Sequence, residues 1–248
     1  MQGNSQQQAY DRGITIFSPD GRLYQVEYAR EAVKRGSPTV GVRTPEGVAL
    51  AAAGRTRSPL QVPESVEKIH EADAHVGIGT AGHAADGRRL VDVARREAQV
   101  ERLRYDQPVG VESLTKAVTD HVQEYTQTGG ARPYGAALLV GGVDGGPGGT
   151  PRLFETDPSG TPYEWRAVAI GGDSGGIRDY LEREYEEGLS LEAGTDLALS
   201  ALAESGDGTL DPEGASAATV AVETGRYERM APTTLRDRVE ELGLDAAN

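Results

Sequence analysis

The sequence has no cysteine among its 248 residues, so no disulfide can stabilise the fold. Secreted enzymes of this size usually rely on disulfides, and their absence favours a reducing compartment. The polar segment 1–13 lacks the basic and then apolar pattern of a signal peptide, and no run of about 18 apolar residues is present to cross a bilayer. We therefore expect a cytoplasmic protein that does not enter a membrane.

Lysine is also scarce. The 25 basic residues comprise three lysines and 22 arginines, against 39 acidic residues, and the formal net charge is −14. Such a chain repels nucleic acid and anionic lipid, so we expect neither as a partner. The acidic residues are spread along the whole chain, which suits a high-salt cytoplasm, where 1 M salt screens charges over about 3 Å. A GC-rich genome that favours arginine codons is the alternative explanation.

The hydrophobic pattern indicates alternating strands and helices. Apolar residues alternate in 39–44 and 47–53 about a turn, which predicts a hairpin. The period then changes to about 3.6 residues in 83–104 and 111–127, which predicts two helices. Further strands are expected at 75–82, 134–143, 152–157, 163–172, 218–224 and 226–231, and further helices at 21–36, 176–188, 191–205 and 233–243.

This order of elements places helices on both outer faces of two packed sheets. The expected fold is therefore α+β, a four-layer αββα sandwich. No stretch reads as a linker, so we expect a single αββα domain at 37–248, preceded by a separate segment at 1–36.

One motif suggests a different reading. Residues 169–176, "AIGGDSGG", contain the Gly-Asp-Ser-Gly-Gly that surrounds the nucleophile of trypsin-like serine proteases, with Ser174 in its place. His83 ends a stretch that resembles the one carrying their general base. The double β-barrel of those enzymes, however, has no place for four internal amphipathic helices. A serine or aspartate where a strand gives way to a helix commonly caps that helix, and this is the role we expect of the motif.

The chain resembles proteasome α-subunits over nearly its whole length. Residues 9–36, "AYDRGITIFSPDGRLYQVEYAREAVKRG", are similar to the N-terminal signature of that family. Other similar segments follow in the family's order at 65–69, 123–139, 151–161 and 181–189. The resemblance implies the same αββα fold and a place in the two outer heptameric rings of a four-ring cylinder, with threonine-protease β-subunits in the inner rings.

The resemblance also implies that this subunit is not a protease. A β-subunit needs an N-terminal threonine whose free amine acts as the base, together with an acidic residue and a lysine. The matching positions are Ser37, Ala53 and Lys68. The nitrogen of Ser37 lies in a peptide bond and Ala53 has no carboxylate, so we expect no catalytic residue, and nothing in the sequence requires a cofactor or a metal. An active protease using Ser37, or Ser174 with His83, is the rival hypothesis.

Three residues match the family's pocket for an activator ATPase, and the resemblance implies that this pocket lies between neighbouring subunits. Lys68 is expected to pair with the C-terminal carboxylate of a proteasome-activating AAA ATPase, since an ammonium is a compact point charge. The backbone of Gly82 and the side chain of Arg30 are expected nearby. His83 stands where relatives often have an apolar residue, and the alternative for Lys68 is an ordinary surface lysine.

The segment before the first helix resembles the family's gate across the axial pore, through which unfolded protein substrates pass. The expected gate residues are Tyr10, Asp11, Arg12, Pro19 and Tyr28. The expected pore constriction is the turn of Thr128, Gly129, Gly130 and Ala131, where glycine lets seven loops approach one axis. The alternative for the glutamine-rich start is a disordered arm.

The helix expected at 21–36 has an apolar stripe that includes Leu23, Val26, Tyr28 and Ala29. No earlier element of the chain is available to pack against this stripe. We therefore expect a neighbouring copy of the chain to cover the stripe and the helix to drive ring assembly. An ordinary amphipathic surface helix is the alternative. A ring without β-subunits that holds unfolded proteins is the rival function from another class.

Overall fold

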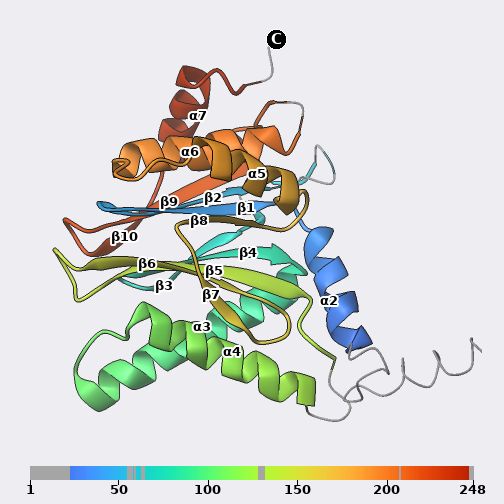
Figure 1. Cartoon of the computed structure of the whole chain (residues 1–248), viewed down its shortest axis with the longest axis vertical. Helices are drawn as coiled ribbons and strands as arrows, with labels where there is room; N and C mark the ends of the chain where they lie inside the picture. The colour runs from blue at the N-terminus through green and yellow to red at the C-terminus, as the bar shows by residue number, and fades with distance from the viewer. Residues whose placement is uncertain are drawn as a thin grey trace, which may run out of the picture.

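The computed structural model describes residues 23–54, 58, 60–62, 65–127, 132–206 and 208–245. In this part of the chain two antiparallel sheets lie face to face with helices on both outer sides (Figure 1). The predicted α+β fold, a four-layer αββα sandwich, is therefore confirmed.

The first sheet has the order β10-β9-β2-β1-β8 and the second the order β3-β4-β5-β6-β7. The strands of the first sheet are β1 (Thr39–Thr44), β2 (Gly47–Ala53), β8 (Ala167–Ile170), β9 (Ala215–Ala221) and β10 (Arg226–Arg229). Those of the second are β3 (Ile69–Asp73), β4 (Val76–Gly82), β5 (Ala136–Asp144), β6 (Thr150–Thr156) and β7 (Pro162–Glu164). The predicted hairpin of β1 and β2 forms with Thr44 opposite Gly47.

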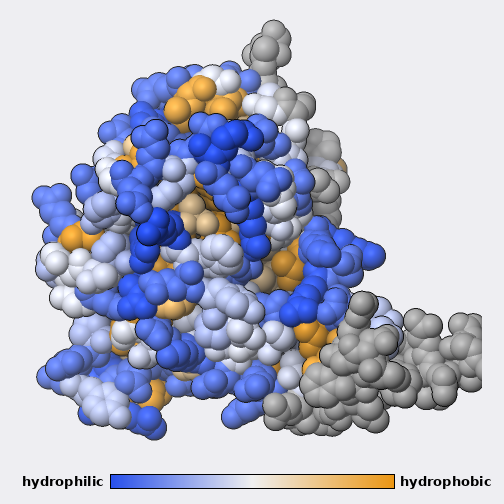
Figure 2. All heavy atoms as spheres, in the orientation of Figure 1, coloured by the Kyte–Doolittle hydropathy of each residue, from blue (hydrophilic) through white to orange (hydrophobic). Residues whose placement is uncertain are grey.

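The helices make up the two outer layers. Helices α3 (Ala84–Tyr105) and α4 (Val111–Gln127) cover the second sheet, and α5 (Ser174–Glu184), α6 (Leu191–Glu204) and α7 (Pro232–Glu241) lie on the side of the first (Figure 1). Three clusters of buried apolar side chains correspond to the three interfaces between the four layers. On the face shown in Figure 2 the hydrophobic patches are small and scattered among hydrophilic residues.

Helix α2 (Tyr24–Lys34) runs along one side of the sandwich and contacts β4 and β5 (Figure 1). Val26, Ala29 and Val33 are buried by the chain's own residues, and Val33 belongs to the cluster between the two sheets. The expectation that the apolar stripe of this helix lies uncovered is therefore wrong for Val26 and Ala29, whereas Tyr28 is 51% exposed.

One strand prediction also needs correction, and one further strand has no counterpart among the predictions. The run predicted as one strand at 163–172 is two, because the chain changes sheets within it: the N–H of Trp165 bonds to Leu153 in β6, whereas the carbonyl of Arg166 accepts from Arg43 in β1. Strand β3 was not predicted. Its sequence, Ile-His-Glu-Ala-Asp, is short and mostly polar, and a bulge interrupts its pairing with β4.

Candidate functional site

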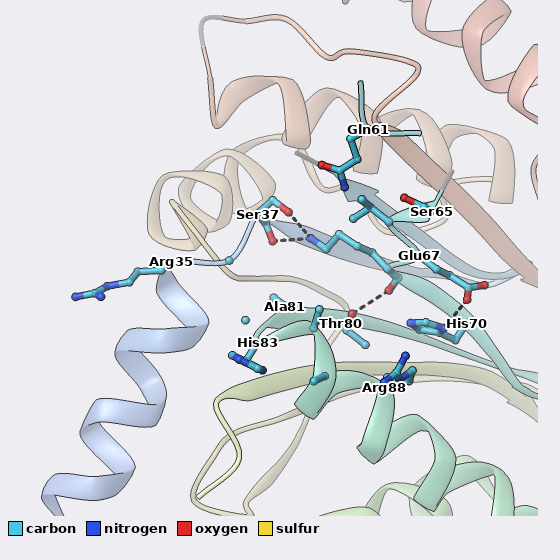
Figure 3. Close-up of a pocket in the computed structure, with 16 residues that line it drawn as sticks. Arg35, Ser37, Gln61, Ser65, Glu67, His70, Thr80, Ala81, His83 and Arg88 are labelled. Carbon is cyan, nitrogen blue, oxygen red and sulfur yellow. Dashed lines mark hydrogen bonds and ion pairs between the residues drawn. The ribbon is translucent and has the colours of Figure 1, made fainter. Parts of the chain in front are cut away.

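A pocket of about 760 Å³ opens where α2, β3, β4 and α3 come together (Figure 3). The segment Arg35–Ser37, between α2 and β1, forms one wall, and Gly82 to Ala85, where β4 passes into α3, forms another. Lys68, which immediately precedes β3, lines the same pocket. The structure therefore brings two of the three predicted activator-binding residues, Lys68 and Gly82, to one pocket.

Lys68 is 8% exposed, and its ammonium group donates to four oxygens of its own chain. The Nζ atom lies 2.6 Å from the carbonyl oxygen of Ser37, 3.0 Å from Ser37 Oγ, 3.0 Å from the Pro38 carbonyl oxygen and 3.1 Å from that of Ala53. Burial lowers the pKa of Lys68 to about 7. Lys68 is thus a buried group held by the backbone and not the solvated surface lysine considered as its alternative.

The three positions that match the catalytic residues of β-subunits converge at this ammonium group. Ser37 supplies a hydroxyl and a carbonyl to Lys68, but its nitrogen is bonded to Gly36 and cannot serve as a base. Ala53 contributes only its main-chain carbonyl, where an acidic side chain would orient the lysine. The arrangement keeps a hydroxyl next to an ammonium and lacks the two groups that would activate the hydroxyl.

Gly82 lies at a tight crossing of main chains. Its φ of +103° is favoured only for glycine, and a Cβ there would overlap the carbonyl oxygen of Gly135 and lie 3.1 Å from Val33 Cα. A Cβ on Gly36 would in turn overlap the backbone nitrogen of Gly82. The end of α2, the end of β4 and the start of β5 can meet beside the pocket because these positions have no side chains.

The start of α3 is fixed by a buried carboxylate. Asp86 accepts two hydrogen bonds from Arg132, at 2.6 and 2.8 Å, and one from the N–H of Gly135 at 2.8 Å. Burial opposes ionisation of Asp86, but the bonds from Arg132 and Gly135 outweigh it and hold the pKa of this carboxyl below its usual value. His83, the residue before α3, is exposed at the pocket wall, with its Nδ1 3.8 Å from Asp86.

Basic groups predominate on the pocket wall. Arg35 and Arg88 line the pocket together with Lys68, and among the described residues that line it Glu67 alone is acidic. Glu67 itself lies 3.3 Å from His70 Nδ1 and 3.5 Å from Arg229. In Figure 3 Arg88 lies on the α3 side of the pocket, whereas Arg35 points away from Ser37. In a chain of net charge −14 this is a local concentration of positive charge that favours an anionic ligand.

Arg35 and Arg88 were not predicted from the sequence. A signal for Arg88 existed, because residues 84, 85 and 88 share one face of the helix that begins after His83. That spacing would have pointed to the residue once Gly82 was assigned to the pocket.

Arg30, the third predicted residue, does not line this pocket within a single chain. Its Nε and Nη2 bond to Asp157 at 2.9 and 3.1 Å, and its Nη1 lies 2.7 Å from Glu27. Burial raises the pKa of Asp157, but the hydrogen bond from Arg30 and the bonds from Ser159 lower it by more, so the pKa lies below its usual value. Because the expected pocket lies between neighbouring subunits, the role of Arg30 stays a prediction.

Ser174 begins α5 as expected, but the capping bond expected of the motif does not form. Asp173 is the N-cap, with a φ of +52°, and its side chain makes no capping hydrogen bond. Ser174 lines a separate hollow of about 170 Å³ together with Arg30, whereas His83 lines the larger pocket. The structure does not bring this serine and this histidine together in one site.

Of the predicted gate and pore residues, one lies in the described part of the chain. Tyr28 lies on α2. Tyr10, Asp11, Arg12 and Pro19, and the turn of Thr128, Gly129, Gly130 and Ala131, lie outside the described residues. Within the described ranges no helix is long and apolar enough to cross a membrane, and no group of three potential metal ligands was found.

Comparison with known proteins agrees with the fold. Residues 33–220 match the family model of the proteasome subunit, and residues 10–32 match that of the proteasome A-subunit N-terminal signature. The chain is 61% identical to the proteasome alpha 1 subunit of Haloferax volcanii, over 97% of this chain and 94% of the relative. It is 66% identical to the proteasome alpha subunit of Natronomonas pharaonis, over 90% and 86%. It is 65% identical to the proteasome alpha 1 subunit of Haloarcula marismortui, over 93% and 87%. The chain therefore belongs to the proteasome family as one of its α-subunits, which are non-catalytic components of the core particle.

Proposed function

We propose that this subunit forms the outer heptameric rings of the core particle, gates the entry of unfolded protein to chambers built by β-subunits, and docks a proteasome-activating AAA ATPase. One observation carries the docking part: Lys68 and Gly82 line one large pocket whose charged side chains are mainly basic. A terminal carboxylate is a small anion that an ammonium at the base of such a pocket can bind. The volume of about 760 Å³ leaves room for several residues of a docked peptide.

Residues 1–36 are assigned to the gating arm and assembly helix, and 37–248 to the αββα domain. The position of α2 supports this assignment, because the helix leads directly into the pocket wall at Arg35–Ser37. A ligand in the pocket would therefore contact the short segment that joins α2 to the αββα domain. Tyr28, 51% exposed on α2, belongs to the surface that we assign to contact with a neighbouring copy of the chain.

Removal of residues 1–12 tests the gate. We expect the truncated subunit, reconstituted with β-rings, to degrade unstructured proteins severalfold faster without an ATPase, because the barrier to entry is gone. Hydrolysis of short peptides should rise less, since these already pass the pore. The measurement is turnover of a fluorescent unstructured protein and of a tripeptide substrate at equal core concentration.

The matched control removes residues 246–248 from the other end of the chain and should leave both rates unchanged. Protein degradation that stays at the level of the full-length subunit would show that the arm is not a barrier.

Docking through Lys68 should depend on pH. With its pKa lowered to about 7, the ammonium is charged below pH 7 and loses its proton as the pH rises, whereas a peptide carboxylate stays ionised throughout. We expect stimulation by the ATPase's C-terminal peptide to fall between about pH 6 and 8. Glu67, His70, His83 and Arg88 also face this pocket, and a Lys68→Arg variant, whose charge does not titrate in this range, separates their contribution. A flat profile in the unmodified subunit would contradict the assignment of Lys68.

A further inference from the structure

The segment that joins α2 to β1 depends on a side chain for its hydrogen bonds. The carbonyl of Gly36 accepts from Gly172 and that of Pro38 accepts from Ala53, both backbone bonds. The carbonyl of Ser37 accepts from Lys68 at 2.6 Å, the shortest of the four bonds that this ammonium makes. Lys68 therefore donates to a carbonyl oxygen, that of Ser37, for which the described residues provide no backbone N–H.

The ammonium group has three protons and is surrounded by four acceptors of its own chain. Three of these acceptors belong to Ser37 and Pro38, and the fourth is the carbonyl of Ala53 at the end of β2. A carboxylate that enters the pocket forms a charge-assisted bond, about twice as strong as a bond between neutral groups. With no proton to spare, Lys68 can bind the carboxylate only by releasing one or more of these oxygens.

Helix α2 is held closely to the segment that joins it to β1. Its last turn ends with Gly36 N–H bonded to the carbonyl of Val33 at 2.9 Å, and Gly36 packs directly against the backbone of Gly82. A change at Ser37 is therefore passed to the end of α2 within two residues.

We propose that Lys68 is a positioning residue for the junction of α2 and β1: in the empty pocket it holds Ser37 and Pro38, and a bound carboxylate draws it away and loosens α2. The second half rests on the proposed docking function, whereas the first half concerns the subunit without ligand. The ligand and the junction of α2 and β1 thus compete for the same three protons.

Hydrogen exchange of the assembled full-length subunit, read by mass spectrometry over residues 24–38, tests both halves. Without ligand, Lys68→Met should speed exchange in this segment about tenfold, because the bonds to Ser37 and Pro38 are lost. Lys68→Gln, which keeps two donors, should give an intermediate rate and replaces the Met variant if that one does not assemble. Lys116→Met is the matched control, since Lys116 is exposed on α4 and pairs with Glu112 at 2.7 Å.

The second half uses a synthetic peptide copying the ATPase's last seven residues, with a free or an amidated C-terminus. The free-acid peptide should speed exchange of residues 24–38 in the unmodified subunit, the amidated peptide should not, and neither should add to the effect of Lys68→Met. Unchanged exchange in ligand-free Lys68→Met, or slower exchange with bound free-acid peptide, overturns the proposal. A peptide that fails to bind refutes the docking function instead, and the ligand-free variants still decide whether Lys68 holds the junction.

Discussion

Gly82→Ala is expected to lower the melting temperature of the protein by about 10 °C. A Cβ at this position would overlap the Gly135 carbonyl and crowd Val33, and both obstacles are backbone atoms that cannot move aside as a flexible side chain would. The positive φ of +103° adds conformational strain. Together these costs come to about 3–5 kcal/mol, and each kcal/mol shifts the melting temperature of a chain this long by about 2–4 °C.

Gly148→Ala separates strain from overlap. Gly148 also has a positive φ, +78°, but nothing lies within 4 Å of where its Cβ would be, so only the strain of about 1–2 kcal/mol applies. Calorimetry at matched protein and salt concentrations provides the measurement. Equal losses in the two variants would show that the crossing beside the pocket tolerates a methyl group, and that its close packing does not depend on glycine.

Lys68→Ala is expected to abolish stimulation at activator concentrations that half-saturate the unmodified core, while leaving basal peptide hydrolysis intact. The loss of one member of a desolvated charge pair typically costs about 2–5 kcal/mol, and high salt favours the low end. A loss of about 2 kcal/mol is a roughly 30-fold weaker affinity for the C-terminal peptide. The measurement is peptide turnover by cores reconstituted with each variant, titrated with ATPase or with its C-terminal peptide.

Lys116→Ala removes an exposed lysine on a different face and should retain full stimulation. Lys68→Arg should restore stimulation only in part, because the planar guanidinium needs more room than an ammonium among four fixed oxygens. Full stimulation of the Ala variant would refute the docking role. Loss of basal hydrolysis as well would point to a failure of assembly.

The regular parts of the fold were most predictable where an element buries one face along most of its length. The helix expected at 111–127 coincides with α4, whose buried side chains recur at helical spacing without interruption. The prediction of one strand at 163–172 failed for a physical reason. Each half of this run has a pattern compatible with a strand, but the pattern does not show that the two halves pair with different sheets.

The site was predictable in composition but not in geometry. Matching of motifs assigned Lys68 and Gly82 to one pocket, and the structure places both residues on its wall. It did not reveal that the ammonium faces inward, because three of its four acceptors are main-chain carbonyls, which every residue possesses. Nor did it reveal that part of the apolar face of α2 is covered within one chain, since Val33 shares a buried cluster with residues far away in the sequence, such as Ala81 and Ile170.

The peptide bond between Gly36 and Ser37 makes two uses of this fold mutually exclusive. A hydroxyl and an ammonium already lie 3.0 Å apart, so a chain beginning at Ser37 would add a free amine to the same spot. The preceding residues therefore act as a permanent protecting group on that nitrogen. A protein of this architecture can carry a helix in front of its first strand or expose a nucleophile there, and a ring that needs both functions must divide them between two kinds of chain.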